Sequence, residues 1–458
     1  MRLLKKIFRV FLVILVLALA YGIWYAWRSF PIISGYGAKN LASGVFLQHR
    51  NPADIIREDL GDFPLSLGSF TVNWEDSSVT GKVWGFAKRK AIYRTGVGCT
   101  LVNEVPESVV RSQSFDIPPA PTTNRDSIAW PIGDRLVDTL PAHIDREHLN
   151  KIVGDVINET HEGVPCYTSG VLVVYDGQII AEQYGRGFDQ HTVMLGWSMS
   201  KSFTAAMIGL LAKRGLLNPD APAPVPEWKG TEKEKITLKD LLQQSSGLDF
   251  LEDYTKFSDV TNMLFNKGDM AAYAAARPLA HPPGSVFNYS GGNTNILSRI
   301  IRQTVGEKAY PGFPYSDLFY KINAYSFRME PDASGTYVGS SYSYATLRDF
   351  ARFGLLYLNN GLWNGEQLLP DDWVTKTRQP APADTLQHYG YQFWLNGFEK
   401  GSPGVRDYPD VPPDMYYCDG YGGQDIYIIP SKKLVVVRTG LHVIDENRML
   451  KEIIASIK

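Results

Sequence analysis

"HTVMLGWSMSKSFTAAMIGLLAKRGLL", residues 191–217, places a serine, Ser198, three residues before a lysine, Lys201. The run "FTAAMIGLLA" that follows is apolar on all sides, so it predicts a buried helix that begins near Ser198 and ends at Gly215. A lysine in the first turn of a buried helix loses hydration, which disfavours its charged form. Residues three apart share a helix face, so a neutral Lys201 is suited to take the proton of Ser198.

Taken alone, Ser-x-x-Lys is a weak signal, because a chain of this length is expected to hold about one by chance. The simpler interpretation makes Ser198 a helix cap and leaves Lys201 in solvent. A nucleophile elbow of the form Gly-x-Ser-x-Gly is disfavoured, because Ser200 takes the place of the second glycine. The apolar helix favours a catalytic pair over both.

Composition excludes several classes of protein. The 458 residues are 44% hydrophobic, enough for a large core, and the formal net charge of -2 gives no reason to expect nucleic acid as a partner. The eight histidines lack metal-ligand spacing, and the three cysteines lie far apart without Cys-x-x-Cys. We therefore expect no metal and no cofactor, while a single disulfide among Cys99, Cys166 and Cys418 stays open.

Residues 1–30 predict an N-terminal membrane anchor. The apolar run from Ile7 to Trp27 is 21 residues long, which at about 1.5 Å per residue spans a hydrocarbon core of roughly 30 Å. Four basic residues near its start predict a cytoplasmic N-terminus and an extracytoplasmic (in a Gram-negative cell, periplasmic) remainder: Arg2, Lys5, Lys6 and Arg9. The alternative is a signal peptide cleaved after Ala20, which would give a secreted protein.

The rest of the chain divides by pattern. Residues 31–140 predict a β-rich extension, with strand-like runs such as "SFTVNW" and "AIYRTGVGCTLV". In "SGVLVVYDGQIIAEQYG", Asp176-Gly177 predicts the turn of a β-hairpin. Helical patterns dominate about 231–375, and strands return at "GQDIYIIP" and "KLVVVRTGL". This order predicts an α/β (α+β) domain over 141–458, built from about 141–230 and 376–458, with a helical insertion between them.

Two later stretches strengthen the catalytic interpretation of Ser198. "HPPGSVFNYSGGN", residues 281–293, places Tyr289 after a Pro-Pro-Gly turn, and "CDGYGGQDIYIIP" places glycines before a late strand. With "TLKDLLQQSSGL" between Ser198 and Tyr289, this order resembles the serine β-lactamase and penicillin-binding-protein superfamily. The likeness is to class C-like members, similar to family VIII carboxylesterases and 6-aminohexanoate-dimer hydrolases. It covers about residue 145 to the C-terminus, and the order is more specific than any single motif.

The resemblance implies a β-lactamase-like fold, with an antiparallel sheet flanked by helices and an inserted, mostly helical domain. It also implies a site in which Ser198 is the nucleophile and Lys201 and Tyr289 exchange protons with it. Tyr421-Gly422-Gly423 would be the third, substrate-binding motif. The backbone N–H groups of Ser198 and Gln424 would form the oxyanion hole.

Two departures from the family pattern bear on the substrate. Gly291 stands where Tyr-x-Asn has its asparagine, with Asn293 as a possible substitute in substrate binding, and Tyr421 replaces a lysine. We therefore expect a serine hydrolase that cleaves a small-molecule ester or amide through an acyl-enzyme. A catalytically inactive binding or sensor protein on the same fold is the alternative, and the sequence leaves the oligomeric state open.

Overall fold

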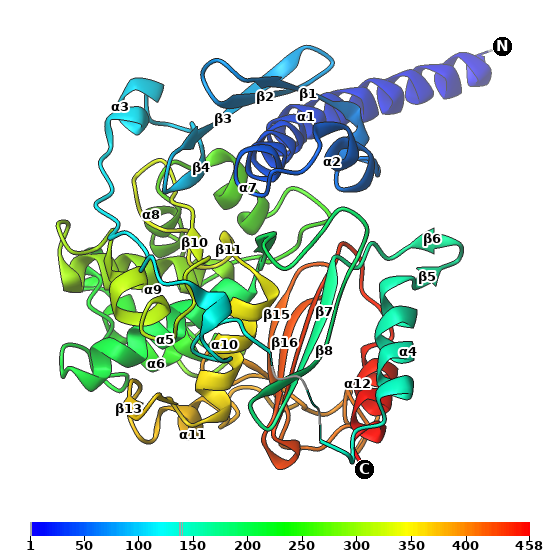
Figure 1. Cartoon of the computed structure of the whole chain (residues 1–458). Coiled ribbons are helices and arrows are strands. Elements are labelled where there is room, and N and C mark those ends of the chain that lie inside the picture. Colours follow the sequence, from blue (N-terminus) through cyan, green and yellow to red (C-terminus); the bar gives the residue numbers. More distant parts are fainter. Residues whose placement is uncertain (1, 137–138, 140) are drawn as a thin grey trace.

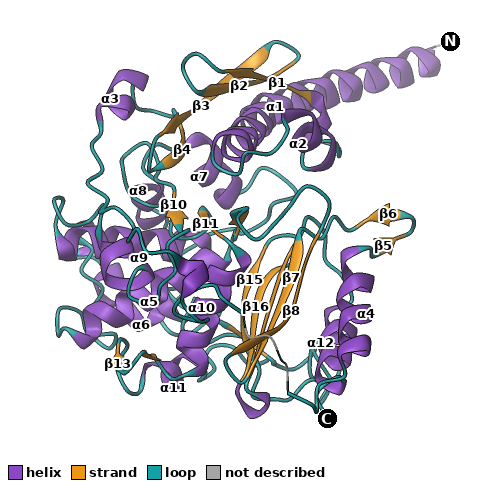
Figure 2. Ribbon diagram, in the orientation of Figure 1, coloured by secondary structure: helices purple, strands orange, loops and turns teal. Residues whose placement is uncertain are grey.

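The computed structural model describes residues 2–136, 139 and 141–458. The domain boundary expected between residues 140 and 141 therefore falls on a residue outside the described part. Figures 1 and 2 show a long N-terminal helix beside a small sheet, a cluster of helices, and a larger sheet with two helices along one side.

The larger sheet is six-stranded, wholly antiparallel and assembled from both parts of the 141–458 region. The strand order is β14-β15-β16-β17-β7-β8. β17 joins the two parts, because it pairs with β7 from Leu434↔Tyr175 to Thr439↔Gly170. The strands are β7 (Gly170–Tyr175), β8 (Gln178–Tyr184), β14 (Trp394–Leu395), β15 (Tyr416–Gly420), β16 (Gln424–Ile429) and β17 (Leu434–Thr439).

The turn expected between β7 and β8 is confirmed. Asp176 and Gly177 connect the strands with φ of 45° and 79°. Positive φ at both central residues defines the type I′ turn, whose twist matches that of the paired strands.

Helices cover both faces of this sheet (Figure 2). α4 (Arg146–Ile157) and α12 (Glu446–Ala455) pack on one face over an apolar layer that includes Val171, Val173 and Val436. α10 (Leu347–Leu358) lies on the other face, towards the helical region, and α5 (Met199–Lys213) packs beside it. The expected antiparallel sheet flanked by helices is confirmed.

The helical region surrounds α5, whose first thirteen residues are all buried. The packing residues of α9, which include Ile296, Ile300 and Ile301, follow helical spacing. Its helices are α6 (Leu238–Leu242), α7 (Asp259–Asn266), α8 (Met270–Ala275), α9 (Gly291–Val305) and α11 (Trp373–Thr377). Short strands pair within and beside it: β9 (Met194–Leu195), β10 (Arg328–Met329), β11 (Ser343–Ala345), β12 (Leu362–Trp363) and β13 (Glu366–Gln367).

The N-terminal helix, α1 (Arg2–Phe46), extends well past residue 30, where the sequence analysis ended the anchor. Its first part is exposed and projects from the body, whereas Ala38, Leu41 and Ala42 are completely buried (Figure 1). Pro31 lies inside the helix, although proline removes a backbone donor there and usually ends a helix. Burial of the second half offsets that cost.

A four-stranded antiparallel sheet packs against the second half of α1, and it contains the strand-like runs expected in the 31–140 extension. Its strands, in spatial order, are β1 (Gly68–Asn73), β2 (Ser78–Val83), β3 (Phe86–Arg94) and β4 (Gly98–Leu101). Further short elements outside these two sheets are α2 (Pro52–Glu58), α3 (Glu107–Ser112), β5 (Thr160–His161) and β6 (Val164–Pro165). Lys39 of α1 forms a buried ion pair with Glu330, which ties α1 to the helical region.

Candidate active site

Ser198 occupies the N-cap position of α5, but its hydroxyl makes no capping bond. Instead, Nζ of Lys201 donates to the Ser198 Oγ at 2.9 Å. Ser200 has a structural role, because its Oγ accepts from the backbone N–H of Ser343. The interpretation of Ser198 as a helix cap, with Lys201 in solvent, is therefore wrong.

Lys201 is buried where a lysine is seldom found. Its side chain is 1% exposed, and Nζ also donates to the Ser340 carbonyl oxygen at 3.1 Å. Burial lowers the pKa of Lys201 to about 8, while the charges of Glu252 and Asp419 act in the opposite direction. Near neutral pH a useful fraction of the amine is thus unprotonated and able to accept a proton.

Tyr289 lies two residues before the first residue of α9. The Lys201 Nζ is 4.8 Å from the centre of the Tyr289 ring, and the rings of Tyr389 and Trp394 flank it at 5.6 and 5.2 Å. Burial, and then the neighbouring Tyr389, raise the pKa of Tyr289 well above its usual value, while the nearby Ser198 hydroxyl acts the other way. The phenol therefore keeps its proton and can donate it.

Glu252 is a member of this cluster that the sequence analysis missed. One carboxylate oxygen lies 4.0 Å from the Lys201 Nζ, and the other accepts from the Gly291 N–H at 2.8 Å. Tyr254 donates its hydroxyl to Glu252 at 3.1 Å. Burial raises the pKa of Glu252, and Lys201 opposes that shift. "SGLDFLEDY" contains no signal that distinguishes this acid from its neighbours, because only the fold brings it to Lys201.

The structure explains why a glycine occupies position 291. A Cβ built there would lie 3.2 Å from the Glu252 Oε1 and 3.4 Å from its Oε2, which is tighter than most contacts between real side chains. The Glu252 carboxylate thus fills the space beside Lys201 into which a side chain at 291 would project. At position 291, where the resemblance led us to expect an asparagine, the space is occupied by the Glu252 carboxylate from another loop.

The Asn293 side chain bonds Ser246 and Gln244 and no member of the catalytic cluster in the described chain. Its Oδ1 accepts from the Ser246 Oγ at 2.8 Å, and its Nδ2 donates to the Gln244 Oε1 at 2.9 Å. The residue is 2% exposed. Both the oxygen and the nitrogen of this amide are used in a buried hydrogen-bond network. Asn293 therefore has a structural role, and the structure gives no support for a role in substrate binding.

Tyr421, Gly422 and Gly423 form the turn between β15 and β16, and both glycines have positive φ. Gln424 is the first residue of β16 and pairs with Gly420 across this turn. Its side chain donates to the Gly440 carbonyl oxygen. The predicted third motif is therefore a hairpin turn, and Gln424 lies beyond it in the next strand.

The end of β15 approaches the segment before Ser198. A Cβ built on Gly420 would collide with the Gly196 carbonyl oxygen, and the Tyr421 ring lies 6.0 Å from that of Trp197. Within the described chain, the backbone N–H groups of Ser198 and Tyr421 donate to no protein acceptor. One donor thus belongs to Ser198 itself, and the other follows Gly420, which packs against the chain just before Ser198.

Aromatic rings form the wall above this cluster. Trp197 contacts the Tyr36 ring of α1 at 6.0 Å, and Tyr421 contacts the Tyr254 ring at 5.7 Å. Tyr421 is 56% exposed and lies at the rim. The helix that emerges from the body as a candidate anchor thus also supports the active-site wall.

In the described part of the chain, no group of three or more His, Cys, Asp and Glu side chains is arranged to hold a metal ion. Cys99, Cys166 and Cys418 are buried free thiols in different parts of the fold.

The fold and this serine–lysine cluster together define a protein of the β-lactamase-like type. A family model described as Beta-lactamase matches residues 158–440, well over half of the sequence, so the chain belongs to the Beta-lactamase family. The resemblance to the serine β-lactamase and penicillin-binding-protein superfamily is thereby confirmed.

Several known proteins are similar over most of this region. The 6-aminohexanoate-dimer hydrolase of Paenarthrobacter ureafaciens is 25% identical over 304 residues, which cover 59% of this chain and 72% of that protein. A putative 6-aminohexanoate-dimer hydrolase from Bacillus anthracis superposes with a TM-score of 0.55 at 23% identity, covering 70% of this chain and 86% of that one. A family VIII carboxylesterase superposes with a TM-score of 0.53 at 14% identity, covering 71% of this chain and 99% of that one. The family and these relatives support a serine hydrolase in general terms.

Proposed function

We propose that this protein is a serine hydrolase that cleaves an ester or amide through an acyl-enzyme on Ser198. The observation that carries the proposal is the 2.9 Å contact between the Ser198 hydroxyl and a buried lysine whose pKa is lowered to about 8. A surface lysine would be protonated near neutral pH and unable to act as a base, whereas Lys201 can accept the hydroxyl proton as Ser198 attacks a carbonyl carbon.

Tyr289 has the role of proton donor in this proposal. As the tetrahedral intermediate collapses, the bond from carbon to the leaving oxygen or nitrogen breaks, and the phenol gives that atom a proton. The Lys201 ammonium, next to the ring, then returns the proton to Tyr289. Water attacks the acyl-enzyme by the same route in reverse, which releases the acid and restores Ser198.

For the developing oxyanion, we assign the backbone N–H groups of Ser198 and Tyr421. Both lack a protein acceptor within the described residues, and Gly420 holds the end of β15 against the chain before Ser198. Fixed donors at this place stabilise charge only when it develops, which is the requirement for transition-state stabilisation. This differs from the sequence analysis, which expected Gln424 as the second donor.

The substrate class follows from the surroundings and the relatives. Tyr421 offers a neutral ring at the rim in place of a lysine, and Trp197 and Tyr254 extend the aromatic surface. The relatives are named as a 6-aminohexanoate-dimer hydrolase and a family VIII carboxylesterase. We therefore propose a neutral ester or amide with an apolar acyl group. Covalent labelling by a fluorophosphonate tests the proposal, with the label expected on the peptide that contains Ser198.

The pH dependence of turnover should reveal the state of Lys201. The active form is the neutral amine, so kcat/KM for an ester should rise with pH along a limb near pH 8 and level off above it. Because the negative charge of Glu252 raises the pKa of Lys201, Glu252→Gln should move this limb to lower pH. Glutamine keeps an acceptor for the Gly291 N–H.

Asp253→Asn is the matched control for this experiment, because Asp253 is the next residue and bonds Thr255 and Lys256 instead. Its pH profile should match that of the wild type. If Glu252→Gln lowers only the thermal unfolding midpoint and leaves the limb in place, Glu252 supports the fold and does not tune Lys201.

We also propose that the first part of α1 anchors the protein in a membrane with the catalytic region outside the cytoplasm. Within the described residues, α1 is the one helix long and apolar enough to span a bilayer. Cleavage after Ala20 and secretion is the alternative, and the two differ in whether the intact chain sediments with membranes after a high-salt wash.

Two truncations should separate the anchor from the folded body. A chain beginning at residue 29 should be soluble and keep its unfolding midpoint, because the contacts of α1 with the body lie mainly beyond it. A chain beginning at residue 47 loses Lys39 and leaves the buried Glu330 carboxylate unpaired, which typically costs about 3–5 kcal/mol of stability.

Lys39→Met in the chain that begins at residue 29 is the control, since it removes the same charge without the deletion. It should lower the unfolding midpoint markedly, though less than the longer truncation. A chain beginning at residue 47 that unfolds at the wild-type temperature would show that α1 adds nothing to the body.

A further inference from the structure

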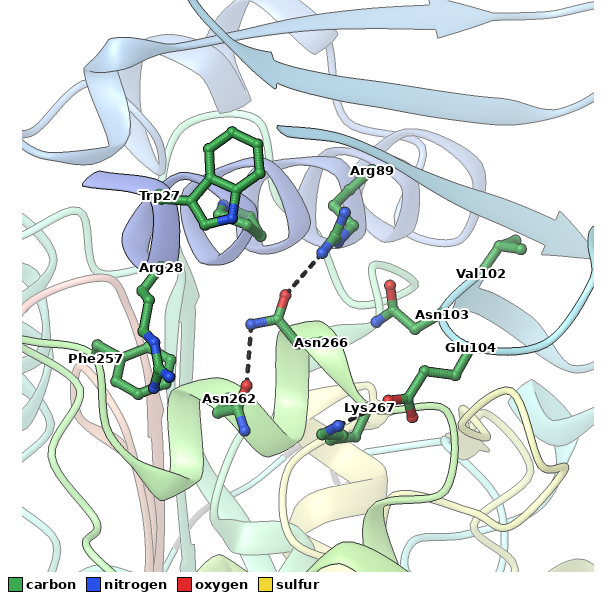
Figure 3. Close-up of a pocket in the computed structure, with 11 residues that line it drawn as sticks. Trp27, Arg28, Arg89, Val102, Asn103, Glu104, Phe257, Asn262, Asn266 and Lys267 are labelled. Carbon is green, nitrogen blue, oxygen red and sulfur yellow. Dashed lines mark hydrogen bonds and ion pairs between the residues drawn. The ribbon is translucent and has the colours of Figure 1, made fainter. Parts of the chain in front are cut away.

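A pocket that shares no residue with the proposed catalytic cluster lies at the foot of the candidate anchor. It has a volume of about 550 Å³ and opens between α1, β3 and α7 (Figure 3). In Figure 3, α1 crosses above the pocket and α7 lies below it. The residues used in the argument are Trp27, Arg28, Arg89, Phe257, Asn266 and Lys267.

The pocket holds two guanidinium groups that pair with no acid in the described part of the chain. Arg28 stacks on the Phe257 ring at 5.0 Å, and none of the described acids forms an ion pair with it. Arg89 donates to the Asn266 Oδ1 and to the Lys88 carbonyl oxygen, each at 3.1 Å, and its buried Nε has no acceptor among the described residues. Burial lowers the pKa of Arg89, with no acid to offset the shift.

The third cation of the pocket is already neutralised. Lys267 forms an ion pair with Glu104 at 2.7 Å, on the side of the pocket away from Arg28 (Figure 3). The charge left over is therefore that of the two arginines. Guanidinium forks with free N–H groups are the side chains that best match phosphate oxygens.

The position of the pocket along α1 indicates which kind of phosphate-containing ligand would reach it. Trp27 lines the pocket and is 74% exposed. One turn further on, the Phe30 ring contacts Trp84 at 5.2 Å. Trp84 is at the tip of the β2–β3 hairpin and is 68% exposed, and Phe86 beside it is 63% exposed. Exposed aromatic rings at one level are typical of a protein surface at the membrane–water interface.

We propose that this pocket binds the phosphate group of an anionic phospholipid from the outer surface of the membrane. Arg28 and Arg89 contact the phosphate oxygens, the Asn266 amide contacts the polar headgroup, and the rings of Trp27 and Trp84 lie among the lipid chains near the interface. The inference rests on the proposed membrane anchor and is independent of the catalytic assignment. It adds a lipid-dependent contact that would fix the tilt of the catalytic region on the membrane.

Native mass spectrometry of the intact full-length chain in detergent tests this site. With phosphatidylglycerol added, we expect one tightly retained lipid per chain, and much weaker retention of phosphatidylcholine. Since each basic side chain near an anionic surface contributes on the order of a fivefold change in affinity, Arg28→Gln with Arg89→Gln should weaken retention about 30-fold. Lys88→Gln is the matched control, because Lys88 precedes Arg89 on β3, is exposed and does not line the pocket.

The outcomes separate the sources of phosphate. Retention of phosphatidylglycerol that the double variant loses and Lys88→Gln keeps supports the proposal, provided that both variants unfold at the wild-type temperature. Equal retention of both lipids, or equal loss in Lys88→Gln, overturns it. Displacement of the lipid by millimolar inorganic phosphate would make the pocket a site for soluble phosphate and would also overturn it. The mass of the intact chain reports cleavage after Ala20 separately, so loss of the anchor is not confused with loss of the site.

Discussion

Ser198→Ala is expected to reduce kcat for a p-nitrophenyl acyl ester by at least about 10³-fold, with no label from a fluorophosphonate. The acyl-enzyme needs an oxygen at this position, and members of a catalytic set act together, so losing the nucleophile removes nearly all the benefit of the others. The fold should survive, because Ser198 makes no capping bond in α5. The measurement is initial rate per folded molecule, with the unfolding midpoint recorded alongside.

Ser200→Ala is the control for this change. Ser200 lies two residues further along and bonds the Ser343 backbone, so its loss should affect stability more than rate. Wild-type turnover in Ser198→Ala would mean that another residue is the nucleophile. Absence of turnover and of labelling in the wild-type protein, under conditions in which it is folded, would favour the inactive binding or sensor protein.

Lys201→Met should lower kcat by about 10²–10⁴-fold while KM changes little, because a general base acts in the transition state. Methionine fills similar space without a charge or a donor. The remaining activity should also lose the limb near pH 8 that Lys201 produces. The readout is the full pH profile of kcat and KM, which a purely structural lysine would leave unchanged.

Lys213→Met is the matched control at the other end of α5, far from Ser198 along the helix. Its kinetics should be those of the wild type. If Lys201→Met instead unfolds at a lower temperature and retains kcat per folded molecule, then Lys201 only balances the charge of Glu252 in the core, and the proposed base must be sought elsewhere.

The elements set by local chemistry could be predicted from the sequence. The apolar run after Ser198 gives α5, and the Asp176-Gly177 turn gives the β7–β8 hairpin, because burial patterns and turn residues act over a few positions. The contact of Ser198 with Lys201 belongs to the same class. Its two partners are three residues apart on one helix, so helical geometry alone brings them together.

Other features depend on contacts between distant parts of the chain, and only the tertiary structure decided them. Pro31 predicts the end of a helix, yet α1 continues to Phe46 because burial against the small sheet, and the pairing of Lys39 with Glu330, offset the lost backbone bond. Glu252 reaches Lys201 only when the loop before α7 folds over α5. The hairpin turn likewise leaves the Tyr421 N–H without a protein acceptor among the described residues, and it puts Gln424 in the next strand. The sequence gives the residue types in such sites. The distances between them are set by packing between residues that are far apart in the sequence.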